Sequence, residues 1–440
     1  MRTKKLGRSL NDPQLNTLIR PLRFLDNHTN LAYLAIDYLT PGLLVAGAAS
    51  LIHFRADLGI SWFVLVPTVA VAIFLIGACQ HRLGGLGHEG AHYMLLKNRV
   101  LNELVSDWFC MFPVLTTTEQ YRQIHLGHHE FTNDWERDPE ILNVAETRRM
   151  ADFPMTARQV CLNFGLRLFW PPTLLRYTWD MLYVSALGNG IHPYMPPGAE
   201  PKYPGKDVRN FRPATLLGMA YIGVMAAVIG ALGFFGTAWW QLAVAPVALL
   251  AGAGLIIWRL PSEWFFRSKI KPVYSTKVSS LIRLGYFTFL QLVISIVQFS
   301  TGQDIAVYFW LLWIVPMVTS FPYLMLIRDL VQHANADDGK LTNSRVVFCN
   351  PLVRWAMFVY GQDAHLTHHL YPAVPHYNLP KLHQLLKDSN EEYAQYAVEC
   401  HGLVVKRRPD APTGIEVLER PTREPIEMPE LAALQSTAID

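Results

Sequence analysis

GHEGAHYMLLKN at Gly87–Asn98 and HLGHHEFTNDWERDPE at His125–Glu140 decide how this chain is interpreted, because histidine recurs in both at helical spacing. Residues i and i+4 of a helix share one face, and residue i+3 lies beside them. A helix can therefore direct two imidazoles to one side from the first segment and three from the second. These histidines are His88, His92, His125, His128 and His129.

A third segment, HLTHH, repeats the spacing of the second segment much later in the chain, with His365, His368 and His369. Neutral imidazole is the commonest metal ligand in proteins, and these eight histidines are half of the 16 in the chain. A single zinc ion takes about four ligands, so we expect one site that holds two metal ions. Imidazole binds iron, zinc, copper and nickel alike, so spacing alone leaves the metal open.

Composition indicates a membrane protein. Of 440 residues, 51% are hydrophobic and only 17% are charged, against about a quarter charged in soluble domains. The 12 Trp and 18 Tyr suit a chain that meets membrane interfaces. A formal net charge of +3, without a basic patch interleaved with aromatics, argues against nucleic acid as a partner. Five dispersed cysteines, never in a CxxC, argue against a disulfide framework and a thiolate metal site.

Six apolar stretches are long enough to cross a bilayer, which takes about 20 helical residues. They pair as hairpins: 31–52 with 59–80, 214–234 with 238–258, and 281–299 with 305–327. The stretch 281–299 has a re-entrant or interfacial segment as its alternative. We therefore expect an all-α integral membrane protein, a bundle of four to six transmembrane helices with a helical cap that holds the histidines.

The hairpins place every long connection on one side of the membrane. The three short turns contain one basic residue, Arg55, whereas the long connections carry nearly all the other Lys and Arg. By the positive-inside rule, the side of the long connections is cytoplasmic. All the histidine segments lie on that side, so we expect the site to face the cytoplasm, at the inner membrane if the source is bacterial.

The two ends of the chain differ from its centre in composition. Residues 1–30 are polar and basic, without the apolar core of a signal peptide, and are expected to form a cytoplasmic arm. Residues 31–390 are expected to form the membrane domain. Residues 391–440 are expected to form a cytoplasmic tail, partly extended because prolines are frequent beyond residue 405. The Pro-rich segment 192–205 is expected to be a loop.

A ninth histidine, His333, lies just beyond the last apolar stretch and is predicted to join the site; its alternative is a surface histidine in the loop QHANADDG. Asp329, four residues earlier on the same helical face, is expected to orient His333 rather than to bind metal itself. Asp134, Asp138 and Asp363 lie near the other segments. Each either fixes an imidazole tautomer or is an ordinary solvated acid.

HEGAH, HLGHH and HLTHH, in this order between membrane hairpins, resemble the three histidine boxes of the membrane fatty acid desaturase family. The sequences that follow the second and third boxes, HHEFTNDWERDPE and HHLYPAVPHYNLPKL, are similar to those of the family as well. The likeness covers residues 31–390. Three boxes in this order are specific for the superfamily, but much less so for the reaction or the substrate.

The resemblance implies two Fe ions in a non-haem di-iron centre, with O2 as co-substrate and a lipid or acyl chain as substrate. Its reaction would remove hydrogens from two adjacent carbons, and the resemblance assigns no catalytic residue apart from the metal ligands. His333 matches an additional family ligand ahead of the third box. The implied ligands are His88, His92, His125, His128, His129, His333, His365, His368 and His369, with Asp329 and Asp363 in supporting positions.

Several features of the sequence bear on the desaturase subtype, the electron donor and the substrate. The first box is HxxxH, as in acyl-lipid types, and the third begins with His365 rather than the Gln of front-end desaturases. No HPGG haem-binding motif is present, so a separate electron donor of the ferredoxin or cytochrome type is expected. The hairpin at 214–258 exceeds the minimal four-span pattern. A hydroxylase, a ketolase, an acetylenase and a desaturase of a specialised metabolite remain alternatives, and the non-enzyme alternative is a histidine-rich metal transporter or receptor.

Overall fold

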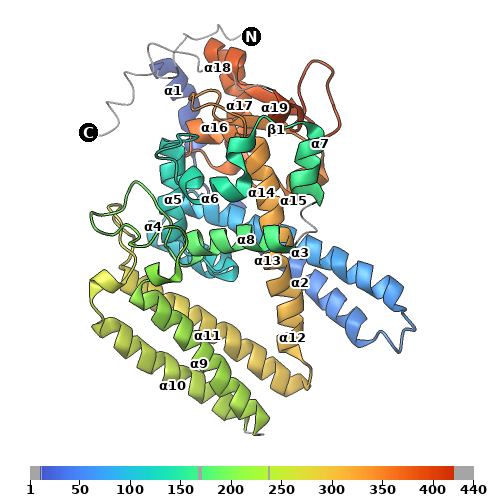
Figure 1. Ribbon diagram of the computed structural model, residues 1–440, viewed down its shortest axis with the longest axis vertical. Coiled ribbons are helices and arrows are strands. Elements are labelled where there is room, and N and C mark those ends of the chain that lie inside the picture. The colour runs from blue at the N-terminus through green and yellow to red at the C-terminus, as the bar shows by residue number, and fades with distance from the viewer. Residues whose placement is uncertain (1–9, 11, 167–170, 236–237, 421–440) are drawn as a thin grey trace.

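The computed structural model describes residues 10, 12–166, 171–235 and 238–420, and helices make up most of it (Figure 1). Six helices in this part of the chain are long and apolar enough to cross a membrane. They are α2 (Thr29–His53), α3 (Trp62–Ala91), α9 (Pro213–Phe234), α10 (Trp239–Arg259), α11 (Thr276–Thr301) and the run Ile305–His333. The six apolar stretches are thus confirmed as helices, and 281–299 lies within one continuous helix.

The last of these runs is a column of several helical pieces. It consists of α12 (Ile305–Phe309), a π-helical turn at Trp310–Ile314, α13 (Val315–Val318) and α14 (Ser320–His333). Pro316 and Pro322 have no backbone N–H to donate, which explains why the α-helical pattern is interrupted near them. The column ends at His333 and so delivers this histidine to the cap.

Helix α3 links the apolar layer to the histidines. Its 30 residues extend about 45 Å, against about 30 Å for the core of a bilayer. Its first turns expose apolar side chains, with Phe63 93% exposed, whereas nearly every residue from Ile76 onward is buried. The helix therefore leaves the apolar layer and enters the cap, where its last turn carries His88, as the sequence predicts.

Shorter helices gather around the ends of α3 and α14 to form the cap (Figure 1). Helix α5 (Thr118–Glu130) packs on α3 and on α6 (Pro139–Arg148), and α6 packs on α8 (Pro171–Met181). The remaining cap helices are α4 (Arg99–Ser106), α7 (Ala157–Val160), α15 (Pro351–Ala356), α16 (His365–Leu370), α17 (Leu379–Ser389), α18 (Glu391–Tyr396) and α19 (Glu416–Glu419).

The expectation of an all-α fold is wrong in one detail. Strands β1 (Arg345–Phe348) and β2 (Val398–His401) form a two-stranded parallel sheet, and Val346 makes a further bridge to Ala364. Each strand has only four residues, too few to stand out as an alternating pattern. The bridge places the sheet directly before α16, the helix of the third histidine segment.

Both ends of the described chain pack on the cap. Helix α1 (Pro13–Ile19) buries Leu15 and Ile19 in an apolar cluster with α17. At the other end, β2 and α19 bury Cys400 and Leu418 in a second cluster with α14. The expected arm (1–30) and tail (391–440) are therefore part of the folded body wherever they are described, and the prolines beyond residue 420 lie outside the described residues.

Helices α9, α10 and α11 form an apolar bundle of their own, drawn in green and yellow in Figure 1. Its core holds Tyr221, Met225, Ile257 and Leu284. Arg283 of α11 ties the bundle to the cap, because its guanidinium donates to the backbone carbonyls of Leu115 and Ala186.

Candidate metal centre

The structure brings all nine predicted histidines together in two adjacent groups. In each group, one ring nitrogen per histidine lies within 4.8 Å of one from every other member. The five-histidine group consists of His88, His92, His125, His129 and His368. The four-histidine group consists of His128, His333, His365 and His369.

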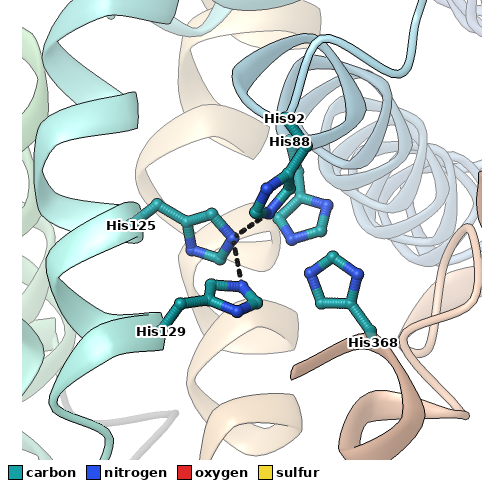
Figure 2. Close-up of side chains that lie close together, drawn as sticks. All are labelled: His88, His92, His125, His129 and His368. Atoms are coloured by element: carbon teal, nitrogen blue, oxygen red, sulfur yellow. Dashed lines mark hydrogen bonds between the residues drawn. The ribbon is translucent and has the colours of Figure 1, made fainter. Parts of the chain in front are cut away.

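The groups cut across the sequence boxes because of helix geometry. On α5, His125 and His129 are one turn apart and enter the five-histidine group, whereas His128 turns to the other group. On α16 the pattern is reversed: His365 and His369 enter the four-histidine group and His368 crosses over. Figure 2 shows the five-histidine group with rings reaching inward from three separate helices. Each HxxHH box therefore serves both groups.

Small residues let the histidine helices approach closely. Gly90 of α3 lies against Ser106, and a Cβ there would overlap the serine hydroxyl. Gly127, between the histidines of α5, lies where a Cβ would come within 2.7 Å of the Pro139 ring. A mid-helix glycine costs about 0.5–1 kcal/mol relative to alanine, and here it permits the close packing that holds the rings in place.

The Nε2 atoms converge in both groups. In the five-histidine group, Nε2 of His125 lies 2.8 Å from Nε2 of His92 and 3.0 Å from Nε2 of His129. In the four-histidine group, Nε2 of His365 lies 2.8 Å from Nε2 of His333 and 3.0 Å from Nε2 of His369. Four or five ring nitrogens aimed at one point are a ligand set for a metal ion.

Outer contacts fix the ring orientation in the four-histidine group. Nδ1 of His128 lies 3.0 Å from Oδ2 of Asp138, and Nδ1 of His333 lies 3.1 Å from the Asn343 carbonyl oxygen. A proton on Nδ1 donates to these oxygens and leaves Nε2 with a free lone pair. Thr132 also places its hydroxyl 3.1 Å from Nδ1 of His369.

The five-histidine group has fewer outer partners. Nδ1 of His88 lies 3.5 Å from a carboxylate oxygen of Glu89, and Nε2 of the same ring lies 3.4 Å from the Gln362 amide. Within the described residues, Nδ1 of His125 and of His129 and both ring nitrogens of His368 are buried without a hydrogen-bond partner. Buried polar atoms are nearly always satisfied. A metal held by the converging Nε2 atoms would satisfy one ring nitrogen of His368, whereas Nδ1 of His125 and of His129 points away from it.

Most of the imidazoles are neutral. Burial, followed by the positive charge that neighbouring rings would carry, lowers the pKa of His125, His129 and His368 well below its usual value. His128 differs: burial alone would lower its pKa, but Asp138 and Glu140 outweigh burial and raise it to about 9. Neutral imidazole is the metal-binding form.

The two aspartates expected to support the site pair with arginines and not with histidines. The carboxylate of Asp329 accepts from Arg148 at 2.7 Å and from Arg328 at 2.6 Å, and His333 turns to the Asn343 carbonyl instead. Two guanidinium groups compete for this carboxylate more strongly than a neutral imidazole does. Asp363 pairs with Arg354 at 2.7 Å, and no described hydrogen bond joins it to a histidine. The expected role of orienting an imidazole is therefore wrong for Asp329.

Asp138 is the acid that does orient a ligand candidate. It is 1% exposed, it caps α6 by accepting from the Glu140 N–H, and it also accepts from the Asn133 N–H. The sequence leaves Asp138 open between this role and that of a solvated acid. The Asp-Pro pair at the start of a helix was a signal that this carboxylate would be fixed as a cap.

Comparison with known proteins identifies the family. The chain matches the family model described as fatty acid desaturase over residues 60–265 and 253–400. The chain belongs to the fatty acid desaturase family. Both histidine groups lie inside the matched desaturase region.

This desaturase family member also has a named relative. The chain is 24% identical to dihydrorhizobitoxine desaturase of Bradyrhizobium elkanii over 404 residues, which cover 90% of this chain and 86% of the relative. Family membership makes the chain an oxidoreductase, and the histidine groups fit a metal site.

Proposed function

We propose that the chain is an O2-dependent, membrane-bound desaturase that holds one iron in each histidine group and introduces a C=C bond into an acyl chain. The single observation that carries the proposal is the pair of buried histidine groups with converging Nε2 atoms, in a chain of the desaturase family. The proposed ligands are the nine histidines of these two groups.

The residues present fit two irons. Two adjacent sets of five and four imidazole nitrogens exceed what one ion takes, and imidazole suits iron as well as other transition metals. Among the metals that imidazole accepts, we propose iron, because the resemblance to the desaturase family implies it.

The proposed reaction removes one hydrogen from each of two adjacent carbons. The bound irons would supply the chemistry that reduces O2 and takes hydrogen from an unactivated C–H bond. For each C=C bond formed, O2, two hydrogens from the substrate, two protons and two electrons become two molecules of water. The electrons must come from outside, and we propose a separate donor of the ferredoxin or cytochrome type.

The protein contributes orientation and exclusion of water. Asp138 and the Asn343 carbonyl hold His128 and His333 with Nε2 directed inward. Seven imidazoles buried in the cap keep bulk water away from the reacting carbon, and His125, His128 and His365 are each less than 5% exposed. Correct positioning of the substrate is a large share of such catalysis.

The apolar helices suggest how the substrate arrives. α3 and the α12–α14 column run from the apolar layer to the histidines, so a lipid chain can reach the site from the membrane. We propose that the site faces the cytoplasm, because the positive residues lie on the side of the long connections.

A second candidate is the desaturation of a specialised metabolite. The observation that favours it is the similarity to dihydrorhizobitoxine desaturase along most of both chains. The hairpin α9–α10 is a further departure from a minimal desaturase. Both candidates share the metal site and the reaction and differ only in substrate.

Two measurements test the proposal. The first is a mass-spectrometric profile of lipids and small metabolites from a host with and without this chain; an oxygen gained without unsaturation would overturn desaturation. The second is the metal content of the purified protein. One zinc and no iron per chain would overturn the di-iron centre and favour a transporter or receptor instead.

A further inference from the structure

A polar cavity lies at the start of α9, and no histidine of the two groups lines it. It has a volume of about 320 Å3 and is formed by the loop before α9 and the segment after α10. Its wall includes part of the Pro-rich loop 192–205, so this loop is built into the fold. The charged side chains that line the cavity are Lys202, Arg209, Arg212, Arg267, Glu200 and Glu263.

A buried amide in the cavity wall has an unused donor. Asn189 is 4% exposed, and its Oδ1 accepts from Nη1 of Arg212 at 3.1 Å. Its Nδ2 has no hydrogen-bond partner within the described residues. An unsatisfied buried N–H costs about 1–3 kcal/mol. The wall therefore presents a donor that needs an acceptor from a ligand.

The positive charge of the cavity is only partly neutralised. Arg209 pairs with Asp207 at 2.6 Å. Arg212 donates only to the Gly188 carbonyl and Asn189, and burial together with the nearby Arg267 lowers its pKa to about 10. In the described part of the chain, no ion pair joins Arg212 or Arg267 to a carboxylate. Arg212 stays cationic at neutral pH, and an anion in the cavity would offset its burial.

The N-terminus of α9 adds to the positive charge of the cavity. This 22-residue helix begins at Pro213, which lines the cavity, and the preceding Arg212 makes no side-chain cap. The N–H groups of Thr215 and Leu216 bond to the Arg212 carbonyl, and Pro213 has none. The helix therefore contributes mainly the partial positive charge of its N-terminus, which favours phosphate and other anions.

Apolar surface continues from the cavity along α9. Leu216 and Met219, one turn apart and close to the cavity, are each 50% exposed. The cavity thus lies at the boundary between polar loops and an apolar helix long enough to cross a membrane. A headgroup in the cavity would leave its acyl chains along Leu216 and Met219.

We propose that this cavity binds the phosphate group of a membrane phospholipid, held by Asn189 Nδ2, Arg212, Arg267 and the N-terminus of α9. The site is separate from the histidine groups, because none of the nine histidines lines this cavity. Phospholipid binding in this cavity is a property beyond the proposed reaction, and it requires neither bound metal nor turnover.

The test measures lipid retained by the purified, full-length protein after reconstitution with a minor fraction of phosphatidylglycerol in phosphatidylcholine. Asn189→Asp keeps the acceptor for Arg212 but replaces the free donor with an anion. We expect the retained phosphatidylglycerol to fall about tenfold, the loss of one charge-assisted hydrogen bond. Arg267→Gln removes an exposed charge at the rim and is expected to lower retention about threefold. Lys271→Gln removes one exposed charge outside the cavity and is the matched control.

Inorganic phosphate is the probe that separates the two sources of phosphate. Displacement of phosphatidylglycerol by inorganic phosphate in the wild type, and its loss in Asn189→Asp, would support the proposal. Binding of inorganic phosphate without enrichment of phosphatidylglycerol would assign a soluble phosphate compound and overturn the lipid site. Equal retention by wild type, Asn189→Asp and Arg267→Gln would also overturn it. Neither result bears on the desaturase proposal, which metal content and products test.

Discussion

The two histidine groups share α5 and α16 but are supported differently. In the four-histidine group, Asp138, the Asn343 carbonyl and the Thr132 hydroxyl each hold one ring from behind, and Nδ1 of His365 is the one buried ring nitrogen without a partner among the described residues. In the five-histidine group, only His88 has such a neighbour among the described residues, and the other buried outer nitrogens are orphaned.

This contrast indicates two ways to build a ligand set. Hydrogen bonds from behind fix the tautomer and the angle of a ring before any metal arrives. The five-histidine group instead relies on close helix packing, on a fifth ring and on the metal itself. Iron binding by the four-histidine group should therefore depend on the hydrogen bonds behind its rings. Iron binding by the five-histidine group should depend on the presence of all five histidines.

The largest loss of turnover is expected from removing His128 or His368. Each is the one histidine of its HxxHH box that belongs to a different group from its two neighbours. His128→Ala takes a ligand from the four-histidine group, and His368→Ala takes one from the five-histidine group. We expect each to abolish turnover and to lower iron from about two to about one per chain, since metal affinity depends on every ligand. Metal analysis and product assays on membrane-inserted protein check this, with His53→Ala, outside both groups, as control. Turnover retained in either variant would remove the assigned site.

His333→Ala should come next. Nε2 of His333 lies 3.3 Å from Nε2 of His128 and 2.8 Å from Nε2 of His365. Helix α14, like α3, supplies ligands to a single group. We expect a large loss of turnover, with iron lost from the four-histidine group alone. The assay is the initial rate on solubilised protein together with iron content. Near-normal rates would make His333 a structural residue and leave that group with three ligands.

Asp138→Asn tests the support behind the four-histidine group. An amide can still accept from His128, but it loses the charge that favours the Nδ1–H tautomer. Changes of this kind typically cost 10–100-fold in metal affinity or activity, so we expect a loss of about tenfold in turnover and weaker binding of one iron. Glu89→Gln is the matched change behind the five-histidine group, and its effect should be smaller because the contact is longer, 3.5 Å against 3.0 Å. Equal losses would contradict the contrast between the groups.

The spans and the eight box histidines could be predicted because their signals are local, whereas His333 is predicted from its place after the last span and from the family resemblance. Runs of apolar residues mark the helices, and i, i+3, i+4 spacing marks the histidine faces. The division into two groups could not be predicted, since it depends on how α3, α5 and α16 are rotated about their axes. Spacing alone treats His128 like His125, although the two rings serve different metals in our proposal.

The misjudged features depend on contacts between distant parts of the chain. Asp329 looks like a partner of His333 within one helical turn, but Arg148 arrives from α6 and takes its carboxylate. Strands β1 and β2 pair across about 50 residues of helices. Long-range pairing of this kind leaves no periodic trace in the sequence.

Asp329→Asn separates stability from metal binding. Asp329 pairs with two guanidinium groups, and when its charge is lost Arg148 keeps Glu140 but Arg328 loses its carboxylate partner. We expect the protein to lose about 3 kcal/mol of stability, while the folded fraction keeps its iron and most of its turnover. Thermal unfolding in detergent, with iron content on the same sample, checks this. Loss of iron without loss of stability would return Asp329 to the role first expected for it.

The smallest effect on metal binding is expected from Glu119, in the first turn of α5. Burial, followed by repulsion from Glu103 and Asp107, raises the pKa of Glu119 to about 8. An unfolded glutamate titrates near about 4.3, so between about pH 5 and pH 8 the folded chain keeps a proton that the unfolded chain releases. Stability from this group is complete below the lower pKa and is lost as the pH rises through the higher one, by up to about 1.4 kcal/mol per pH unit.

Glu119→Gln removes this titration while keeping the shape of the side chain. We expect the unfolding temperature of the wild type to fall more steeply than that of the variant between about pH 6 and pH 8, with little change in iron content. Titration of the histidines is common to both proteins and cancels in the difference. Parallel profiles would mean that Glu119 is ionised in the fold, and the carboxyls of α4 and α5 would then supply negative charge beside the five-histidine group after all.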